Sequence, residues 1–214
     1  MGRRKLHGDL TRDALLTAAE ALVAQGGIDA VSVRGAAAGA GTTTRAVYVL
    51  FGSKEGLLEA LARRTFELLM DAIAAVPPSS DPGRDLINRS VGGFRAFALK
   101  HPDLFLLFFT AQVSRRALGS DAAASGTVAY AQLAELIERA QQTGLLGRHS
   151  VEEATLLWDA LCTGLALREI CGPITSTDGE RIWTEALEAF LVGLGRDHDA
   201  STDSKSDAGP THDR

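Results

Sequence analysis

The sequence predicts an all-α protein of about nine helices. Segments long enough to classify repeat their apolar residues at i, i+3, i+4 and i+7, and these segments are rich in Ala and Leu. The alternation typical of a strand is confined to Val31 and Val33. The 214 residues, 45% of them apolar and 23% charged, suffice to bury a hydrophobic core, which excludes a disordered chain.

The first helix is predicted to begin near Asp9 or Thr11, because either side chain can cap it. Its inward stripe consists of Leu15, Ala18, Ala19, Leu22 and Val23. Gly26-Gly27 is expected to end this helix, since glycine is the common residue after a helix C-terminus.

Two short helices follow, separated by a glycine turn. Ser32 can cap the first of them, Gly41 breaks it, and Thr43 can cap the second. The second short helix carries its apolar residues, Val47, Leu50 and Phe51, on one side. A helix, a glycine-centred turn and another helix are the parts of a helix-turn-helix.

A long fourth helix is expected between the Ser53 cap and Pro77-Pro78. Its inward residues are Leu57, Leu58, Leu61, Phe66, Leu69, Met70 and Ile73. Further helices follow a short linker: Asp81-Pro82 is a cap with proline at the first helical position, and His101-Pro102 separates two helices.

The seventh helix is predicted over residues 120–144. The last two helices begin with capping boxes, Ser150–Glu153 and Thr177–Glu180, in which a hydroxyl and a carboxylate satisfy each other's backbone donors. From residue 196 onward the sequence lacks apolar periodicity, and we predict that it is disordered.

The outward edge of the second short helix suits a DNA groove. Opposite its apolar side lie Arg45 and Val49, flanked by Tyr48 and Thr44, with Thr43 at the cap. Arginine can donate two hydrogen bonds to guanine, threonine can bond a base or a phosphate, and a valine methyl can contact thymine. The Tyr48 hydroxyl is better placed for a phosphate.

Cations flank this edge, although the net charge of the chain is −5. Ser53-Lys54 provides a positive charge and free backbone donors at a helix N-terminus, which suits a phosphate. Ser32 and Arg34 can hold the DNA backbone on the other side. Arg3-Arg4-Lys5 forms either a mobile basic arm that contacts DNA or an N-terminal segment whose charges only increase solubility.

The segment Thr11–Leu58 resembles the N-terminal DNA-binding domain of the tetracycline-repressor (TetR) family, above all in the stretch Gly41-Thr-Thr-Thr-Arg-Ala-Val-Tyr-Val-Leu-Phe-Gly-Ser-Lys-Glu-Gly-Leu57. The resemblance implies that residues 42–46, which begin with Thr42, lie at the DNA and that Tyr48 and Lys54 lie at phosphates. Ala46 stands where the family often has Thr, and Leu50 where it often has His, so contacts by those side chains are lost.

Two later segments resemble the regulatory domain of a TetR subgroup marked by a Trp…His-Gly signature. They are Phe94-Arg-Ala-Phe-Ala-Leu-Lys-His-Pro102 and Leu157-Trp-Asp-Ala-Leu-Cys-Thr-Gly-Leu165. Thr163 replaces the histidine of the signature, so any role of that imidazole is absent here. The resemblance implies a small-molecule inducer.

Phenylalanines crowd residues 94–109 and indicate either a closed core or the lining of an apolar pocket. The residues that we assign to a ligand pocket are Phe94, Phe105, Phe108, Phe109 and Trp158. Because the sequence shows no obvious buried charge, we expect a neutral or lipophilic ligand rather than a strongly ionic one.

The last two helices carry more apolar residues than one packing face requires, which suggests a partner. The candidates for a homodimer interface are Leu161, Leu165, Trp183, Leu187, Phe190 and Leu191. Two helices from each of two chains would form a four-helix bundle and set two recognition helices about 34–36 Å apart on a palindrome. Packing within a single chain is the alternative.

No catalytic or metal site is indicated. The histidines are scattered, and Cys162 and Cys171 lack neighbouring metal ligands, so we expect reduced structural thiols. Gly35, Gly39 and Gly41 match a dinucleotide-binding pattern, but the alternating strands that an oxidoreductase of this kind requires are missing. We expect no enzyme activity, no cofactor and no metal.

These observations predict a cytoplasmic, ligand-responsive transcriptional regulator, a repressor that binds a palindromic operator as a homodimer. Residues 1–53 would form the DNA-binding unit, 54–195 the ligand-binding and dimerisation unit, and 196–214 a disordered tail. The apolar runs are too short to span a bilayer. The alternative function is an all-helical small-molecule-binding protein or enzyme that has lost DNA binding.

Overall fold

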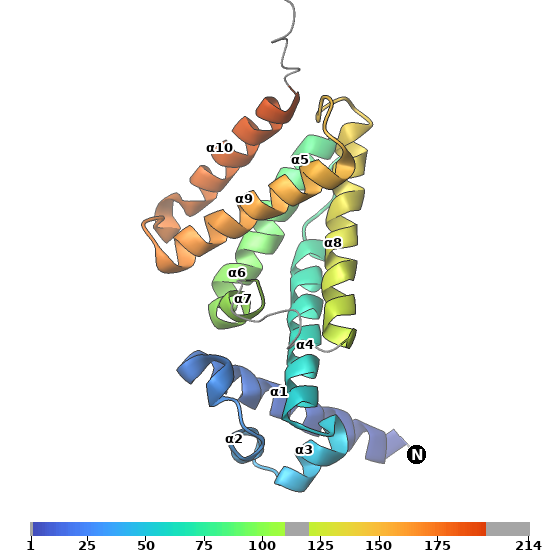
Figure 1. Cartoon of the computed structure of the whole chain (residues 1–214), viewed down its shortest axis with the longest axis vertical. Coiled ribbons are helices and arrows are strands. Elements are labelled where there is room, and N and C mark those ends of the chain that lie inside the picture. Colours follow the sequence, from blue (N-terminus) through green and yellow to red (C-terminus); the bar gives the residue numbers. More distant parts are fainter. Residues whose placement is uncertain (1, 110–119, 196–214) are drawn as a thin grey trace, which may run out of the picture.

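The computed structural model describes residues 2–109 and 120–195, and in these ranges every regular element is a helix. The helices are α1 (Gly2–Ala30), α2 (Val33–Gly39), α3 (Thr44–Phe51), α4 (Lys54–Ala74), α5 (Pro82–Arg89), η1 (Ser90–Arg95), α6 (Ala96–Lys100), α7 (Pro102–Phe109), α8 (Ser120–Gln141), α9 (Val151–Cys171) and α10 (Ser176–Gly195). Helices α1–α3 form a head at one end, and α4 leads from it into a larger helical unit (Figure 1). The predicted all-α class with an N-terminal helix-turn-helix is confirmed, whereas the predicted tail lies outside the described residues.

Helix α1 begins earlier than the sequence indicated. Its backbone is helical from Gly2, not from residues 9–11. Gly8 disfavours a helix only by about 1 kcal/mol, and the segment before it lacks proline and contains Arg, Lys and Leu, which are good helix formers. The backbone of Arg3-Arg4-Lys5 is therefore part of α1 rather than a mobile arm. The predicted break is confirmed, since Gly26 and Gly27 leave helical geometry, Gly27 with φ 68°.

The caps predicted for α2 and α3 are confirmed. Ser32 Oγ accepts a hydrogen bond from the Gly35 backbone N–H at 3.0 Å, and Thr43 Oγ1 accepts one from the Ala46 N–H at 3.3 Å. Gly41, between the two helices, has φ 63°, a conformation that strains any residue with a Cβ. The helices of the head enclose a core formed by Leu15, Leu16, Ala19, Val23, Val31, Ala36, Ala37 and Val47.

Helix α4 joins the head to the larger unit. Ser53 Oγ accepts a hydrogen bond from the Gly56 N–H at 3.1 Å, which confirms the predicted cap. Leu57 and Leu61, in the first half of α4, are buried in the head core, whereas Leu69 is buried in the core of the larger unit. Both ends of this one helix are therefore held by packing.

Residues 82–100 form a continuous helical segment, because α5, η1 and α6 follow one another without a break. The middle part is π-helical, a feature that the sequence did not predict. Gly93 lies here against α4: a Cβ on Gly93 would come within 2.7 Å of the Ile73 Cα, closer than real Cβ contacts. The missing side chain thus allows the backbones of η1 and α4 to touch.

Helix α7 contributes to two hydrophobic cores. Leu104 and Leu107 are buried in the core of the head, and Phe108 packs beside them. Phe105 is buried in the core of the larger unit, with Phe109 packed against it. The two sets occupy different faces of a helix of eight residues, so α7 lies at the junction between head and larger unit.

Polar contacts tie the head to neighbouring helices as well. His101 Nδ1, just before α7, donates a hydrogen bond to Glu20 Oε1 of α1 at 3.0 Å. Arg64 of α4 lies 3.6 Å from Asp13 Oδ1 of α1, but the aspartate side chain is 70% exposed, so solvent screens this pair. The histidine contact is the better shielded of the two, because both of its side chains are partly buried.

The last two helices begin differently. Ser150 and Glu153 form the predicted capping box at α9: the Glu153 N–H donates to Ser150 Oγ at 3.2 Å, and the Ser150 N–H donates to Glu153 Oε2 at 3.0 Å. The box predicted at Thr177–Glu180 is wrong, because α10 already begins at Ser176 and Thr177 lies inside it. None of the described helices combines the length and the apolar character needed to cross a bilayer.

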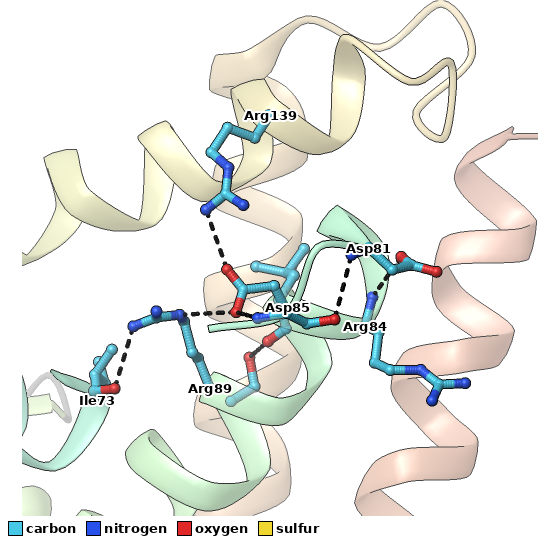
Figure 2. A network of polar contacts seen from close by, with 9 residues as sticks. Ile73, Asp81, Arg84, Asp85, Arg89 and Arg139 are labelled. Atoms are coloured by element: carbon cyan, nitrogen blue, oxygen red, sulfur yellow. Dashed lines mark hydrogen bonds and ion pairs between the residues drawn. The ribbon is translucent and has the colours of Figure 1, made fainter. Parts of the chain in front are cut away.

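Asp85 is the centre of a polar network that joins α5 to α4 and α8 (Figure 2). Its carboxylate, 1% exposed, accepts hydrogen bonds from Arg89 Nε at 3.2 Å, Arg139 Nη1 at 3.1 Å and the Ser79 backbone N–H at 2.9 Å. Arg89 also donates to the Ile73 carbonyl of α4 at 3.2 Å. Burial by itself raises the pKa of Asp85, but these hydrogen bonds and the charge of Arg89 outweigh it and hold the pKa below its usual value.

A second buried network joins η1, α9 and α10. Arg95 donates from Nε and Nη2 to the two carboxylate oxygens of Glu169 at 2.9 and 2.7 Å, and Trp183 Nε1 donates to the same carboxylate at 3.0 Å. A side chain on Gly179 would collide with this carboxylate, which explains a glycine inside the first turn of α10. The network fixes α10 against the larger unit.

Candidate nucleic-acid interface

Helix α3 presents the predicted edge to solvent. Thr43, Thr44 and Arg45 are exposed, Tyr48 is 56% exposed and Val49 is 75% exposed. Tyr48 and Val49 are two of the three large apolar side chains that the described part of the head exposes, the third being Leu10 of α1. The edge therefore combines hydrogen-bonding and apolar groups that a second molecule can reach.

The opposite side of α3 is anchored to the head. Val47 is fully buried, and Leu50 and Phe51 pack against the head core. Arg12 of α1 places its guanidinium carbon 4.7 Å from the centroid of the Phe51 ring and donates to the Leu50 carbonyl at 3.4 Å. Sequence reasoning missed Arg12, because the contact joins residues 38 positions apart and no local pattern reveals it.

The predicted backbone-contacting residues of α2 lie beside this edge. Ser32 and Arg34 are exposed at the start of α2, and Thr42 is half-buried in the turn that leads to α3. The Ser32 hydroxyl accepts the capping hydrogen bond described above and keeps its own O–H for donation to another acceptor. The side chains of Ser32 and Arg34 therefore combine a capping role with donors directed away from the core.

Lys54 is partly buried at the start of α4, where the structure modifies one expectation. The pKa of neighbouring Glu55 is lowered, first by hydrogen bonding from its own backbone N–H and from the Ser53 side chain, with a smaller effect from the Lys54 charge. An exposed carboxylate therefore competes with a phosphate at this helix end. The Lys54 ammonium group thus remains as the phosphate candidate at this helix end.

The local charge of this surface is positive despite the acidic chain. Between Val31 and Lys54 the sequence contains Arg34, Arg45 and Lys54 and no Asp or Glu. Both arginines are exposed. These three cations attract a polyanion to this face, and the nearest carboxylate after them is the exposed Glu55.

The larger unit brings three of the predicted pocket residues into one aromatic cluster. The ring of Phe94 lies 5.8 Å from Phe105 and 5.8 Å from Phe109, and Phe105 stacks on Phe109 at 5.0 Å. Two rings outside the predicted set join them: Phe66 of α4 and Phe97 of α6 lie 5.5 and 6.0 Å from Phe109. Phe66 was predicted to face inward on α4, but the sequence offered no signal that it meets α7.

Two residues assigned to the same pocket lie elsewhere. Phe108 packs against the head core, because on α7 it shares the side of Leu104 rather than that of Phe105. Trp158 is 1% exposed; its ring lies 6.0 Å from Phe190, and its Nε1–H donates to Ser90 Oγ at 2.9 Å. We therefore remove Phe108 and Trp158 from the aromatic cluster.

Three of the six residues assigned to a homodimer contact are buried within the chain. Trp183 and Leu187 are fully buried and Leu191 is 7% exposed, so they pack into the core of their own unit and offer no surface to a second chain. The regular spacing of these three apolar residues along α10 is explained by their packing in this core. Leu161, Leu165 and Phe190 are partly buried. The large apolar side chains exposed on α9 and α10 are instead Leu156, Leu157 and Val192.

Both cysteines are free thiols. Burial raises the pKa of Cys162 to about 12, so its thiol is neutral and serves packing, whereas Cys171 is exposed at the end of α9. Over the described ranges, no three His, Cys, Asp or Glu side chains are placed to hold a metal ion.

Two family models match the chain in succession. The model of bacterial regulatory proteins of the tetR family matches residues 15–61, which contain α2, α3 and most of α1. The model of the tetracyclin repressor-like C-terminal domain matches residues 88–190. No curated protein sequence gives a match.

Solved structures share the fold at low sequence identity. A protein of unknown function from Rhodococcus sp. RHA1 has a TM-score of 0.75 and 24% identity, with 87% of this chain and 96% of that chain covered. The TetR-family regulator PfmR from Thermus thermophilus has a TM-score of 0.65 and 20% identity over 85% and 99%. A ketosteroid transcriptional regulator of Mycobacterium tuberculosis has a TM-score of 0.61 and 20% identity, with 87% of this chain and 95% of that chain covered.

Proposed function

Because the chain belongs to the tetracycline-repressor (TetR) family of bacterial regulatory proteins, we propose that it regulates transcription by binding DNA through its head. Two heads in a homodimer would bind a palindromic operator and repress transcription, and a small molecule bound in the larger unit would release them. Such a regulator works beside the chromosome, in the cytoplasm. Residues 1–53 would serve DNA binding, and residues 54–195 ligand binding and dimerisation.

The observation that carries this proposal is the arrangement of α3. The helix is capped by Thr43, anchored by Val47 and Arg12, and exposes Thr44, Arg45, Tyr48 and Val49 along one edge. A recognition helix needs this combination, because base contacts require side chains that project from a rigidly held backbone. The cations around the edge supply the attraction to phosphates on which DNA affinity depends.

Replacing Arg45 by alanine is expected to relax sequence preference. We assign this exposed side chain to a base edge, where a bidentate arginine–guanine contact contributes about 1–3 kcal/mol of discrimination. Affinity for the DNA upstream of the protein's own gene should fall about 10- to 100-fold, while affinity for a scrambled duplex changes little. Fluorescence anisotropy with both duplexes measures this. Arg84→Ala, an exposed arginine on α5, is the matched control, and an equal loss on both duplexes would contradict the assignment.

Replacing Lys54 by alanine is expected to weaken binding to all duplexes alike. A lysine at a phosphate releases about one counterion, so the slope of log affinity against log salt concentration should become shallower by about one. The same anisotropy titrations at several salt concentrations give the slope. Lys100→Ala removes an exposed lysine far along the chain and should leave the slope unchanged. If Lys54→Ala also leaves it unchanged, Lys54 does not contact a phosphate.

The surface that we propose for the homodimer combines exposed apolar and small residues of the last two helices. These are Leu156, Leu157, Ala160 and Gly164 on α9 and Ala189, Val192 and Gly193 on α10. A Cβ on Gly164 or Gly193 would meet no atom within 4 Å, so both glycines face open space where a second helix can approach closely. Leu161, Leu165 and Phe190, partly buried, would border this surface in a four-helix bundle.

Effector control would act through two conformers of the dimer. A ligand that binds better to the conformer with wrongly spaced heads shifts the equilibrium by that difference in affinity. The partly accessible rings of Phe66, Phe94 and Phe109 would contact the apolar part of the effector. Phe105, which was assigned to the same pocket, is fully buried and supports Phe109 by stacking on it.

A further inference from the structure

The outward edge of α3 carries an apolar side chain that the described part of the chain leaves largely uncovered. Val49 is 75% exposed, the largest exposed fraction among the large apolar side chains that the structure describes. Helix α3 lies at the end of the molecule remote from α9 and α10, so the proposed dimer surface does not cover Val49 either (Figure 1). The isopropyl group is therefore accessible to a molecule that binds at the head.

Val49 and Arg45 lie in one line along α3. They are four residues apart on this helix, which places their Cβ atoms about 6 Å apart on the same side. Both point away from the fully buried Val47, since a rotation of roughly 100° per residue turns each of them by about 160–200° from it. Arg45 is also exposed. A surface that meets the Arg45 guanidinium group will therefore meet the Val49 methyl groups as well.

The direction of Val49 is fixed by the way α3 is held. The Thr43 cap at 3.3 Å secures the start of the helix, and the Arg12 contact to the Leu50 carbonyl at 3.4 Å secures its end. Valine is branched at Cβ and has one strongly preferred rotamer in a helix. Tyr48, the other exposed apolar residue of α3, is turned from Val49 by roughly 100°. The two γ-methyl groups of Val49 thus have defined positions beside Arg45.

The major groove of DNA offers one kind of apolar group to such a side chain. Its base edges carry hydrogen-bond donors and acceptors, apart from the methyl group on C5 of thymine. A valine pressed against a donor or an acceptor would displace its water and return no hydrogen bond, which costs affinity. Against a methyl group, the same valine buries apolar surface and adds affinity. Val49 is therefore matched to a pyrimidine that is methylated on C5.

We propose that Val49 reads the C5-methyl group of one pyrimidine in each half-site, about two base pairs from the guanine that Arg45 reads. The spacing follows from a rise of about 6 Å over four helical residues and of about 3.4 Å per base pair. Thymine carries this methyl group, and so does 5-methylcytosine. The inference rests on the proposed function, because it requires α3 in the major groove, and it adds the base chemistry of the operator.

A thymine scan of the upstream duplex tests the methyl contact. Each thymine is replaced in turn by deoxyuridine, which removes only the methyl group, and anisotropy gives the affinity of the full chain. We expect about a fourfold loss at one thymine in each half-site, the effect of one buried methyl group, and a loss of about tenfold when both are replaced. A parallel scan with 7-deazaguanine, which lacks the N7 acceptor, locates the guanine read by Arg45. A separation of more than about four base pairs would overturn the pairing.

The variant Val49→Ala assigns the methyl contact to this side chain. It should bind the native duplex about as weakly as the native chain binds the deoxyuridine duplex, and it should lose the sensitivity to deoxyuridine, since both changes remove the same contact. Because the side chain is exposed, Tm should not change. Val128→Ala, at a 55% exposed valine of α8, is the matched control and should keep both affinity and sensitivity. Full sensitivity in Val49→Ala would overturn the inference.

A scan with 5-methylcytosine in place of each cytosine separates the two sources of the methyl group. Tighter binding by the native chain but not by Val49→Ala would show that methylated cytosine is read. Sensitivity to deoxyuridine without this gain would assign the contact to thymine alone. A chain that prefers the upstream duplex to a scrambled one but responds to neither modification keeps the proposed function and refutes the methyl contact. A chain that binds no duplex at low salt refutes both.

Discussion

The variant Asp85→Ala is expected to unfold with a free energy about 3 kcal/mol lower than that of the native chain. The substitution leaves Arg89, 18% exposed, and Arg139, 46% exposed, without their common carboxylate, and it removes the acceptor of the Ser79 N–H. Because both arginines keep contact with solvent, we place the effect at the lower end of the range for broken buried ion pairs. Urea unfolding followed by circular dichroism, at one fixed protein concentration, measures the difference.

The control for this prediction is Glu185→Ala. Glu185 pairs with Arg181 on the surface of α10, and their side chains are 62% and 60% exposed. Solvent screening limits this pair to about 0.5 kcal/mol. A similar loss in both variants would show that the Asp85 network adds nothing beyond a surface ion pair.

Acid should remove the contribution of Asp85. Its pKa is lowered in the folded chain, so the stabilisation is present above the unfolded value of about 3.9 and is lost as the pH falls through the folded value. The stability difference between the native chain and Asp85→Ala should therefore be full near pH 7 and shrink below about pH 4. Unfolding curves across this range test the sign, and a difference that grows in acid would contradict it.

The variant Leu157→Asp is expected to abolish the homodimer and with it tight operator binding. Leu157 is 41% exposed on α9 within the proposed dimer surface, where an aspartate would be buried without a partner. A dimer engages two half-sites at once, so its loss should reduce affinity for a palindromic duplex about 100-fold or more. Light scattering coupled to size-exclusion chromatography gives the mass, and anisotropy gives the affinity.

Val128→Asp is the matched control. Val128 is an apolar side chain with 55% exposure, but it lies on α8, outside the proposed dimer surface. This variant should keep both the dimer and the operator affinity. A monomeric native chain would refute the homodimer, and a Leu157→Asp chain that remains dimeric would place the contact on another surface.

Local features of this fold could be predicted from the sequence. Ser32, Thr43 and Ser53 are caps in the structure because a cap depends only on a side chain and a backbone N–H three residues later. The outward edge of α3 followed from the spacing of Val47, Leu50 and Phe51, since a period of 3.6 residues places them on one side. The exposure of the predicted DNA-contacting residues of α3 is therefore a consequence of local geometry.

Contacts between distant segments could not be predicted. Glu169 meets a partner 74 positions away, and Asp85 meets Arg139 across 54 positions. Periodicity also predicts that a side chain is buried but does not identify the residues that bury it. Trp183 and Leu187 were predicted to contact a second chain, yet they are buried in the core of their own chain. The aromatic cluster was incomplete for the same reason, because Phe66 arrives from α4.

The two hydrophobic faces of α7 show that residues 1–53 do not contain the whole hydrophobic core of the head. A fragment that ended there would lack Leu57 and Leu61 from α4 and also Leu104 and Leu107, which occupy the interior of the head from half the chain away. Such a fragment would expose apolar surface to water and leave vacant volume, each of which opposes a stable fold. Helix α7 thus completes the core of the head while it also packs in the core of the larger unit. A shift of α7 in one core therefore changes the packing of the other.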